Sequence, residues 1–294
     1  MIVNKGGGTS KGDDEEAARI KAAFEAEGVD ADVRPTEPAE LPGAFSDAAG
    51  TKGLDAVVAG GGDGTLNCAA GHLADTGRAM GVLPLGTLNH FARDAGIPVK
   101  LEEAVAVIAK GRTKQVDVAE VNGDVFINNS SVGLYPDMVR LREAQQERIG
   151  RGKRLAMLTA SWASLRHFRR HRLWISAPGL EAPVKTPLLF VGNNRYQVNL
   201  FALGQRERLD AGELCLYAIR ARSRAHLLWA GVRGIFGKLD QQRDFVTAYV
   251  TEAEISSDRP QLSVSADGEA LRLETPLRYR IRPGALKLIV PPEG

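Results

Sequence analysis

Residues 57–67 read Val57-Val58-Ala59-Gly60-Gly61-Gly62-Asp63-Gly64-Thr65-Leu66-Asn67. A short apolar run leads into a run of glycines, which is followed by a carboxylate, a hydroxyl and a helical pattern over 65–73. Glycine lets the backbone approach a ligand closely, and the N–H groups at the start of a helix attract an anion. The stretch predicts a strand, a phosphate-binding turn and a helix. The alternative is a glycine-rich turn that binds nothing.

The glycine loop matches neither of the common nucleotide-binding fingerprints. The pattern G-x-x-x-x-G-K-[ST] is absent, because the nearest candidate, Gly6 to Lys11, has Ser10 directly before its lysine. The dinucleotide pattern G-x-G-x-x-G fails because Thr65 occupies the position of its last glycine. The sequence therefore does not favour a P-loop fold or a Rossmann dinucleotide-binding fold.

A second loop of similar character follows the next strand. Residues 81–94 read Gly81-Val82-Leu83-Pro84-Leu85-Gly86-Thr87-Leu88-Asn89-His90-Phe91-Ala92-Arg93-Asp94. A strand, a rigid proline, Gly-Thr and a helix start would bring further N–H and hydroxyl groups to the same sheet edge, where neighbouring loops can share one ligand. An ordinary turn is the alternative.

The pattern around these loops changes near residue 115. Before it, strands are expected at 1–3, 29–34, 54–59 and 79–83 and helices at 13–27, 65–73 and 101–110. Such alternation predicts a parallel sheet covered by helices. After it, period-two strands are expected at 116–121, 125–129, 188–192, 214–220, 245–255, 262–266, 270–273, 277–281 and 286–290, with helices at 137–168 and 224–239. The fold class is α/β, with an expected parallel-sheet nucleotide domain at 1–115 and a mainly antiparallel domain at 116–294.

Composition excludes several classes of protein. The chain has 294 residues, of which 44% are hydrophobic and 25% charged, as in ordinary globular proteins and unlike disordered or fibrous ones. No apolar run is long enough to span a bilayer, and the first residues lack the apolar core of a signal peptide, so a cytoplasmic location is expected. The only cysteines are Cys68 and Cys215, which excludes a disulfide scaffold and a Cys-based zinc site.

Charge is unevenly distributed along the chain. Residues 1–100 carry 9 Lys and Arg against 15 Asp and Glu, whereas the remainder carries 29 against 21. Between Arg140 and Arg172 there are ten basic and two acidic residues, which accounts for the whole basic surplus. Such a segment attracts phosphate in a nucleic acid, an anionic membrane or a metabolite, and charge alone does not choose among them.

Gly-Gly-Asp-Gly-Thr followed about twenty residues later by Pro-Leu-Gly-Thr-x-Asn resembles the catalytic domain of the diacylglycerol kinase and sphingosine kinase group, including the bacterial lipid kinases. A more distant resemblance runs to NAD kinase. Two further segments are similar to the group's pattern: Asp210-Ala211-Gly212-Glu213-Leu214 to its Asp-Asp-Gly-x-Leu, and Asp267-Gly268-Glu269 to its Asp-Gly-Glu turn. The resemblance implies an ATP- and Mg²⁺-dependent kinase that phosphorylates a hydroxyl of diacylglycerol or a related lipid in phospholipid metabolism.

The resemblance also implies which residues form the site. The ATP contacts carried over are Asn4, Thr36, Gly61, Gly62, Asp63, Gly64, Thr65, Leu66, Asn67 and Thr87. Glu269 would be the proton acceptor, with Asp267 beside it and Asp63 as a metal-linked partner or rival base. Phosphoryl transfer needs carboxylates for these tasks in any case. Without the resemblance, Asp267-Gly268-Glu269 would be read as a plain hairpin turn.

Three departures from the group's pattern affect details of the site. At the N-terminus, Asn4 to Gly8 stand where the group has its first motif, Asn-Pro-x-x-Gly, and Lys5 replaces the proline. His90 replaces the common aspartate of Gly-Thr-x-Asn-Asp. Ala211 replaces the second aspartate of Asp-Asp-Gly, which weakens or removes the group's structural metal site and leaves Asp210, with Glu207, as the candidate metal ligands.

The sequence offers several interpretations of the residues that would bind the phosphate acceptor. Residues 226–239 place apolar side chains near one helical face with basic residues at its edges, which fits a lipid groove, a membrane-surface helix or an ordinary packed helix. The expected partners are a lipid substrate and, peripherally, an anionic membrane; no nucleic acid is expected, and a homodimer stays open. The alternatives are a kinase for a soluble acceptor, similar to NAD kinase, and a degenerate protein that binds nucleotide or lipid without catalysis.

Overall fold

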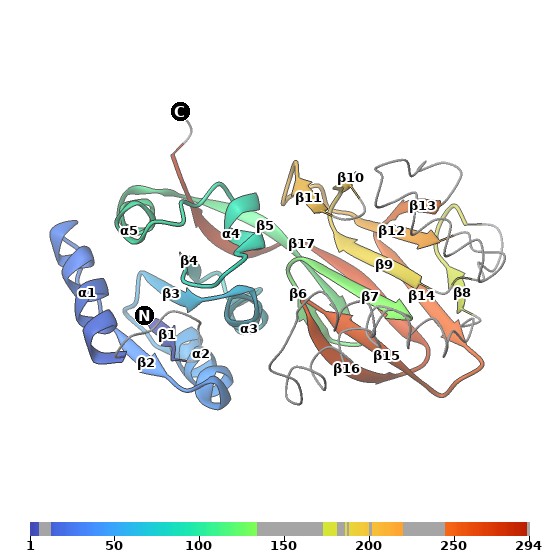
Figure 1. Ribbon diagram of the computed structural model, residues 1–294, viewed down its shortest axis with the longest axis horizontal. Helices are drawn as coiled ribbons and strands as arrows, with labels where there is room; N and C mark the ends of the chain where they lie inside the picture. The colour runs from blue at the N-terminus through green and yellow to red at the C-terminus, as the bar shows by residue number, and fades with distance from the viewer. Residues whose placement is uncertain are drawn as a thin grey trace, which may run out of the picture.

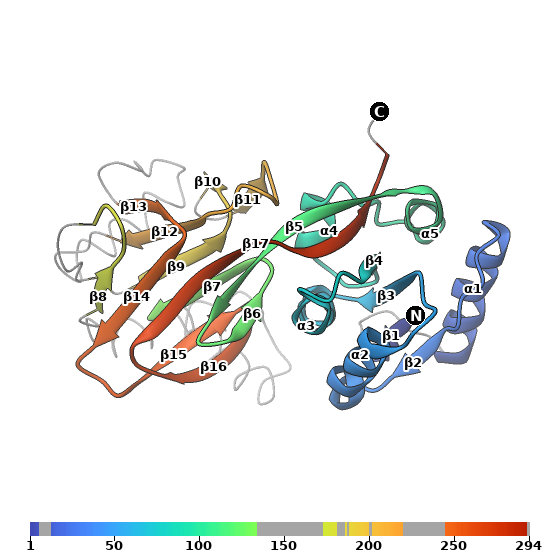
Figure 2. The same cartoon turned by 180° about the vertical axis from the view of Figure 1, so that it is seen from behind.

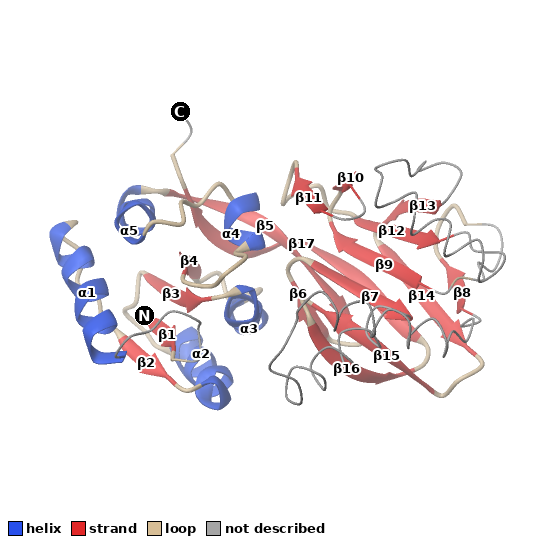
Figure 3. Ribbon diagram, viewed as in Figure 1, coloured by secondary structure: helices blue, strands red, loops and turns tan. Residues whose placement is uncertain are grey.

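The computed structural model describes residues 1–5, 13–133, 173–180, 186, 188–199, 202–219 and 245–292. In Figure 1 the chain forms two lobes, one with helices around a sheet and one built of strands, and two long strands run between them. Figure 3 shows that the helices of the described residues all belong to the first lobe.

The first lobe contains the expected parallel sheet. Its strands are β1 (Ile2–Asn4), β2 (Arg34–Thr36), β3 (Ala56–Gly61) and β4 (Ala79–Pro84), in the order β2-β1-β3-β4, and all these neighbours pair in parallel. Its helices are α1 (Asp13–Ala26), α2 (Leu41–Gly50), α3 (Asp63–Leu73), α4 (His90–Asp94) and α5 (Leu101–Lys110). Because the strands are parallel, their carboxyl ends and the loops that follow them lie at one edge of the sheet.

Helices cover both faces of this sheet. The helix α1 contacts α5, and α2 contacts α3. Each helix turns an apolar side chain toward the strands, such as the fully buried Phe24 of α1, Phe45 of α2 and Leu66 of α3. Burying such a side chain stabilises the fold by about 1.5–3 kcal/mol.

The second lobe is a sandwich of two sheets. One contains β13 (Phe245–Val250), β12 (Leu214–Ile219), β9 (Leu188–Asn193), β7 (Asn129–Gly133), β15 (Gln261–Ala266) and β16 (Glu269–Glu274), in that order and antiparallel throughout. The other contains β6 (Asp124–Phe126), β14 (Glu252–Ser257), β8 (Leu173–Ser176) and parts of β5 (Arg112–Val121) and β17 (Leu277–Val290). Their inner faces enclose a second core that includes Phe126, Val191 and Tyr279. A small separate sheet pairs β10 (Tyr196–Asn199) with β11 (Ala202–Arg206).

Two long strands join the lobes. The strand β17 pairs antiparallel with β5, and its carboxyl end pairs parallel with β4, so the last described strand completes the first lobe (Figure 2). The pairing is irregular between Arg282 and Leu286, where Gly284 has a φ of 61°. The buried Asp117 carboxylate accepts the Gly284 N–H at 2.8 Å and the Gly212 N–H at 2.7 Å. These bonds hold the bend between the lobes.

The fold class expected from the sequence is confirmed. The predicted division at residue 115 falls inside β5, and the sheet continues across it, while Leu286, Leu288 and Val290 lie in the core of the first lobe. The domain limits therefore remain a prediction. Tight turns are present at Asn122-Gly123 and at Asp267-Gly268, where all four residues have positive φ angles.

Some element bounds were wrong. Residues 29–33 form no strand, and β2 begins at Arg34. The expected strand at 245–255 is two strands, β13 and β14, separated at Thr251. The two expected segments at 277–281 and 286–290 are one strand. The predicted helices at 137–168 and 224–239, and with them the basic segment at 140–172, lie outside the described residues.

No helix among the described residues combines the length and apolar character that crossing a bilayer requires.

Candidate functional site

The glycine loop connects β3 to α3, and one of its glycines, Gly61, has no room for a side chain. A Cβ on Gly61 would lie 2.4 Å from the Thr65 hydroxyl oxygen, so only glycine fits there. Gly62 is the N-cap of α3, and no side chain caps the helix, which leaves its first N–H groups facing the loop. The buried side-chain oxygen of Asn67, one turn further along, has no hydrogen-bond partner among the described residues. A close backbone, open N–H groups and an unpartnered polar atom together fit a phosphate-bearing ligand.

The second loop, residues 84–89, lies against the first. A Cβ on Gly86 would be 2.5 Å from the Gly62 Cα, so the two backbones touch. Asn89 has left-handed φ and ψ angles of 51° and 47°, and its side chain closes the loop. Its Oδ1 accepts the Gly86 N–H at 3.0 Å, and its Nδ2 donates to the carbonyl oxygens of Pro84 and Gly86 at 3.2 and 2.8 Å.

Asp63 ties the two loops together. Its Oδ2 accepts the His90 N–H and its Oδ1 accepts the Phe91 N–H, both at 3.1 Å. A carboxylate at the N-terminus of a helix is stabilised by the N–H groups and the helix dipole. The first residue of α3 therefore supports the start of α4, and both Asp63 oxygens are engaged by backbone.

The other predicted nucleotide contacts are spread along the same sheet edge. Asn4 ends β1 and donates through Nδ2 to the Thr65 hydroxyl at 2.9 Å, and Thr36 ends β2 with its hydroxyl on the Arg34 carbonyl oxygen. Thr87 is exposed, and Leu66 is fully buried in the core, so the side chain of Leu66 faces away from any ligand. Lys5, the departure from the first motif, pairs with Glu37 at 3.3 Å.

The Asp267-Gly268 turn between β15 and β16 is anchored by Asp267. Its Oδ2 accepts the Ile127 N–H at 2.7 Å, and its Oδ1 accepts the Asn128 and Asn129 N–H groups, each at 2.9 Å. Burial has the largest effect on the pKa of the Asp267 carboxyl group and raises it to about 6. The three N–H donors and the charge of Arg206 act in the opposite direction and lower this pKa. Asp267 is thus an internal support of the hairpin.

The pH dependence of stability follows from Asp267. Its folded pKa of about 6 lies above the ordinary 3.8, so folding favours its protonated form. The stability of the wild type relative to Asp267→Asn is therefore largest below the ordinary pKa and is lost as the pH rises through the folded pKa. The total change amounts to about 3 kcal/mol. Urea unfolding of both proteins from about pH 4 to pH 7.5 measures it; a difference that stays constant with pH would contradict this assignment.

Glu269 follows the turn and faces the glycine loop from the other lobe. Glu269 is exposed, and its Oε1 lies 3.6 Å from the position that a Cβ on Gly64 would take. Cys68, on the next turn of α3, is half-buried, and its pKa is raised by burial and by the charge of Glu269. The structure therefore brings Glu269 and the glycine loop together, although they are about 200 residues apart in the sequence.

The predicted structural metal site does not fit the residues present. Asp210 pairs with Lys114 and Arg208, each at 3.0 Å, and these cations lower its pKa against burial, which raises it. Glu207 is exposed. Within the part of the chain that the structure describes, no three His, Cys, Asp or Glu side chains are grouped to hold a metal ion. Two basic side chains thus neutralise Asp210, and nothing supports a cation there.

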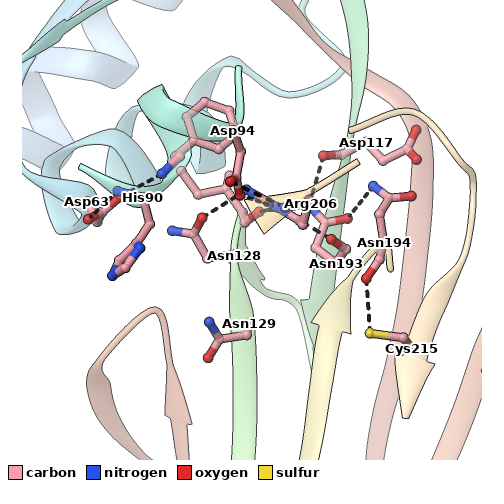
Figure 4. A network of polar contacts seen from close by, with 12 residues as sticks. Asp63, His90, Asp94, Asp117, Asn128, Asn129, Asn193, Asn194, Arg206 and Cys215 are labelled. Carbon is pink, nitrogen blue, oxygen red and sulfur yellow. Dashed lines mark hydrogen bonds and ion pairs between the residues drawn. The ribbon is translucent and has the colours of Figure 1, made fainter. Parts of the chain in front are cut away.

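Sequence reasoning missed three polar residues at the junction of the lobes, Asp94, Asp117 and Arg206. Figure 4 shows them in one network, with Asp94 on α4 and Arg206 on β11. The Arg206 Nε donates to Asp94 Oδ2 at 2.6 Å. In the sequence, Asp94 and Arg206 are each marked only as a charged residue that follows apolar residues. Such a pattern does not identify a partner 112 residues away.

Comparisons with known proteins agree with this geometry. A family model described as the diacylglycerol kinase catalytic domain matches residues 1–121. A probable YegS-like lipid kinase of Pseudomonas aeruginosa is 30% identical over 246 residues, covering 81% of this chain and 78% of the relative. One of Yersinia pestis is 40% identical over 95 residues, which is 31% of this chain and 32% of the relative. The crystal structure of a putative diacylglycerol kinase from Bacillus anthracis str. Sterne covers 98% of this chain and 95% of its own, at 22% identity and a TM-score of 0.70. That likeness concerns the fold.

Proposed function

Because the chain belongs to the YegS-like lipid kinase family, we propose that it transfers the γ-phosphate of ATP to a hydroxyl group of diacylglycerol or a related lipid. The family resemblance expected from the sequence motifs is thereby confirmed, while the donor and the acceptor belong to the proposal. The observation that carries it is the placement of the exposed Glu269 carboxylate opposite the glycine loop.

The nucleotide is proposed to lie at the carboxyl edge of β1 to β4. The first N–H groups of α3 and the side chain of Asn67 would bind its phosphates, because no side chain caps the helix and the Asn67 oxygen has no hydrogen-bond partner among the described residues. Thr87, exposed on the second loop, would add a hydroxyl. The touching glycines Gly62 and Gly86 leave the floor of the site free of side chains, so that phosphate oxygens can reach the backbone.

Glu269 is proposed as the base. It would accept the proton of the lipid hydroxyl while that oxygen bonds to the γ-phosphorus and the bond from phosphorus to the ADP oxygen breaks. Its exposure supports this role, because a base must reach its substrate. Asp63 and Asp267 have both oxygens engaged by backbone N–H groups, so they are proposed to position the loop and the hairpin.

Mg²⁺ would neutralise the phosphate charge during transfer. It is commonly held by substrate phosphates and one or two carboxylates, so it needs no dedicated protein cage. Both oxygens of Asp63 are engaged by backbone N–H groups, and Glu269 is assigned to the proton, so the metal would be held mainly by phosphate oxygens and water. The site residues are thus compatible with a metal brought by the nucleotide.

The lipid acceptor is proposed to be presented by a membrane surface that the protein contacts only peripherally. The decisive experiment incubates purified protein with labelled ATP, Mg²⁺ and mixed vesicles that contain diacylglycerol, with and without anionic phospholipid. We expect phosphate transfer to the lipid, and faster transfer on anionic vesicles, at least about threefold at low salt. Wild-type protein that transfers no phosphate to any lipid would contradict the proposal, and turnover of a soluble acceptor without vesicles would support the NAD kinase-like alternative instead.

A further inference from the structure

Arg206 is a buried cation for which the proposed chemistry has no direct use. Its side chain is 0% exposed, and that of its partner Asp94 is 6% exposed. The guanidinium lies over the rings of Phe91 and Tyr196, at 5.9 and 5.4 Å from their centroids. Removing a charge pair from water is costly, and such a pair is tolerated where its hydrogen bonds are well satisfied.

The same guanidinium also binds a turn of its own lobe, the second one. One terminal nitrogen donates to the Ile127 carbonyl oxygen at 2.5 Å, and the other donates to Asn128 Oδ1 at 2.9 Å. The N–H groups of this turn, residues 127–129, are those that bind the Asp267 carboxylate. Arg206 therefore holds the turn from its carbonyl side, beside Asn128 in Figure 4, while Asp267 holds it from its amide side.

These contacts close into a ring around the junction of the lobes. Asp63 in the glycine loop binds the start of α4, and Asp94 at the end of α4 binds Arg206. Arg206 binds the turn 127–129, which binds Asp267. Glu269, two residues further on, returns to the glycine loop at Gly64. Short polar contacts thus run from the glycine loop to the Glu269 hairpin, and the proximity of Glu269 to Gly64 closes the ring.

We infer that Arg206 is a positioning residue that holds the Glu269 hairpin against the glycine loop, acting through Asp94 on one lobe and the turn 127–129 on the other; this rests on the proposed function, in which Glu269 is the base. A planar guanidinium suits the task because it donates in several fixed directions at once, which a lysine ammonium on a flexible stem does not. A misplacement of about 1 Å at a reacting group can lower a rate about 100-fold.

The test uses Arg206→Gln and Asp94→Asn, with Arg282→Gln as the matched control. Arg282 also joins the two lobes, through ion pairs with Asp75 and Glu120, but it lies outside the ring. Arg206→Lys keeps the positive charge but not the planar guanidinium, so its comparison with Arg206→Gln separates charge from geometry. If Arg206→Gln does not unfold cooperatively, Arg206→Lys takes its place in the test. Cys68→Ser identifies which cysteine reacts in the labelling measurement, since Cys215 is buried.

Two quantities are measured. The first is kcat and KM for MgATP: we expect kcat to fall about 30- to 100-fold in Arg206→Gln and Arg206→Lys while KM changes less than about threefold, because the phosphate-binding loops keep their own contacts. The second is the rate at which a disulfide reagent labels Cys68. Burial, and after it the charge of Glu269, raise the pKa of this thiol, so retreat of the hairpin should lower that pKa and accelerate labelling up to about tenfold.

The outcomes separate this inference from the proposed function. Faster Cys68 labelling and lower kcat in the Arg206 and Asp94 variants, with Arg282→Gln near wild type, support it. Unchanged labelling in folded Arg206 variants overturns it, whatever their activity. If wild-type protein shows no lipid kinase activity while the Arg206 variants still accelerate labelling, the proposed function fails and the positioning of the hairpin by Arg206 stands.

Discussion

Glu269→Gln lowers kcat for lipid phosphorylation by about 10³ and leaves the dissociation constant for MgATP within about twofold of wild type, as expected when a general base is removed. The amide has the shape of the carboxylate but accepts no proton at neutral pH. Because Glu269 is exposed and its hairpin is held by Asp267, we expect the thermal midpoint to stay within a few degrees of wild type. Steady-state kinetics and equilibrium nucleotide binding measure the two effects.

The matched control for this prediction is Glu274→Gln. Glu274 is an exposed glutamate at the other end of the same strand, β16, opposite Gln261. It loses the same charge at a distance from the glycine loop, so its kcat should remain near wild type. Equal losses in both variants would show that the charge of the hairpin, rather than a base at Glu269, affects turnover. A fully active Glu269→Gln would contradict the assignment.

Gly86→Ala separates the two loops. Its Cβ would lie 2.5 Å from the Gly62 Cα, which is backbone, and 2.8 Å from Asn89 Oδ1, whose side chain is held by hydrogen bonds to Pro84 and Gly86. We expect a loss of about 1–3 kcal/mol in the free energy of unfolding, as for other overpacked sites. Nucleotide affinity should fall at least about tenfold, the equivalent of about 1.4 kcal/mol, because the loops no longer share one ligand. Urea unfolding and calorimetric titration with MgATP measure these effects.

Gly43→Ala is the control for Gly86→Ala. Gly43 lies in α2, and a Cβ there would meet nothing within 4 Å. Alanine is a better helix former than glycine, so this variant should gain up to about 1 kcal/mol and bind nucleotide as wild type does. If Gly86→Ala behaved like Gly43→Ala, the contact between the two loops would not be needed for binding.

Much of the local structure could be predicted from the sequence because its signals are local. The apolar run before Gly60 and the helix over 101–110 depend on neighbouring residues, and Asn122-Gly123 and Asp267-Gly268 carry their own turn preference. The helix α2 was missed because Pro42 and Gly43 stand in its first turn, where proline is tolerated but masks the pattern. One expected strand at 245–255 proved to be two because both halves have the same composition.

The candidate site could be predicted only in part, because its pieces meet through the tertiary fold. The family resemblance identified both Glu269 and the glycine loop as site residues. Their proximity, however, depends on the bend at Gly284 and on its bond to Asp117, and no local sequence pattern indicates either of these. The pairing of Arg206 with Asp94 is non-local in the same way. The predicted metal ligand Asp210 was assigned without knowledge that Lys114 and Arg208 would neutralise it.

The return of β17 to the first lobe bears on the order in which the chain can fold during synthesis. Residues 1–121, which the family model matches, contain the glycine loop but not Leu286 and Leu288, which are fully buried in the core of that lobe beside β4 and β5. The Asp75 N–H likewise finds its acceptor at the Ala285 carbonyl oxygen. While the ribosome is still making residues 122–276, β4 has β3 on one side but lacks β17 on the other, and apolar side chains of this lobe are exposed. It completes its core only when β17 emerges, so this lobe cannot reach its final packing before most of the second lobe has been synthesised.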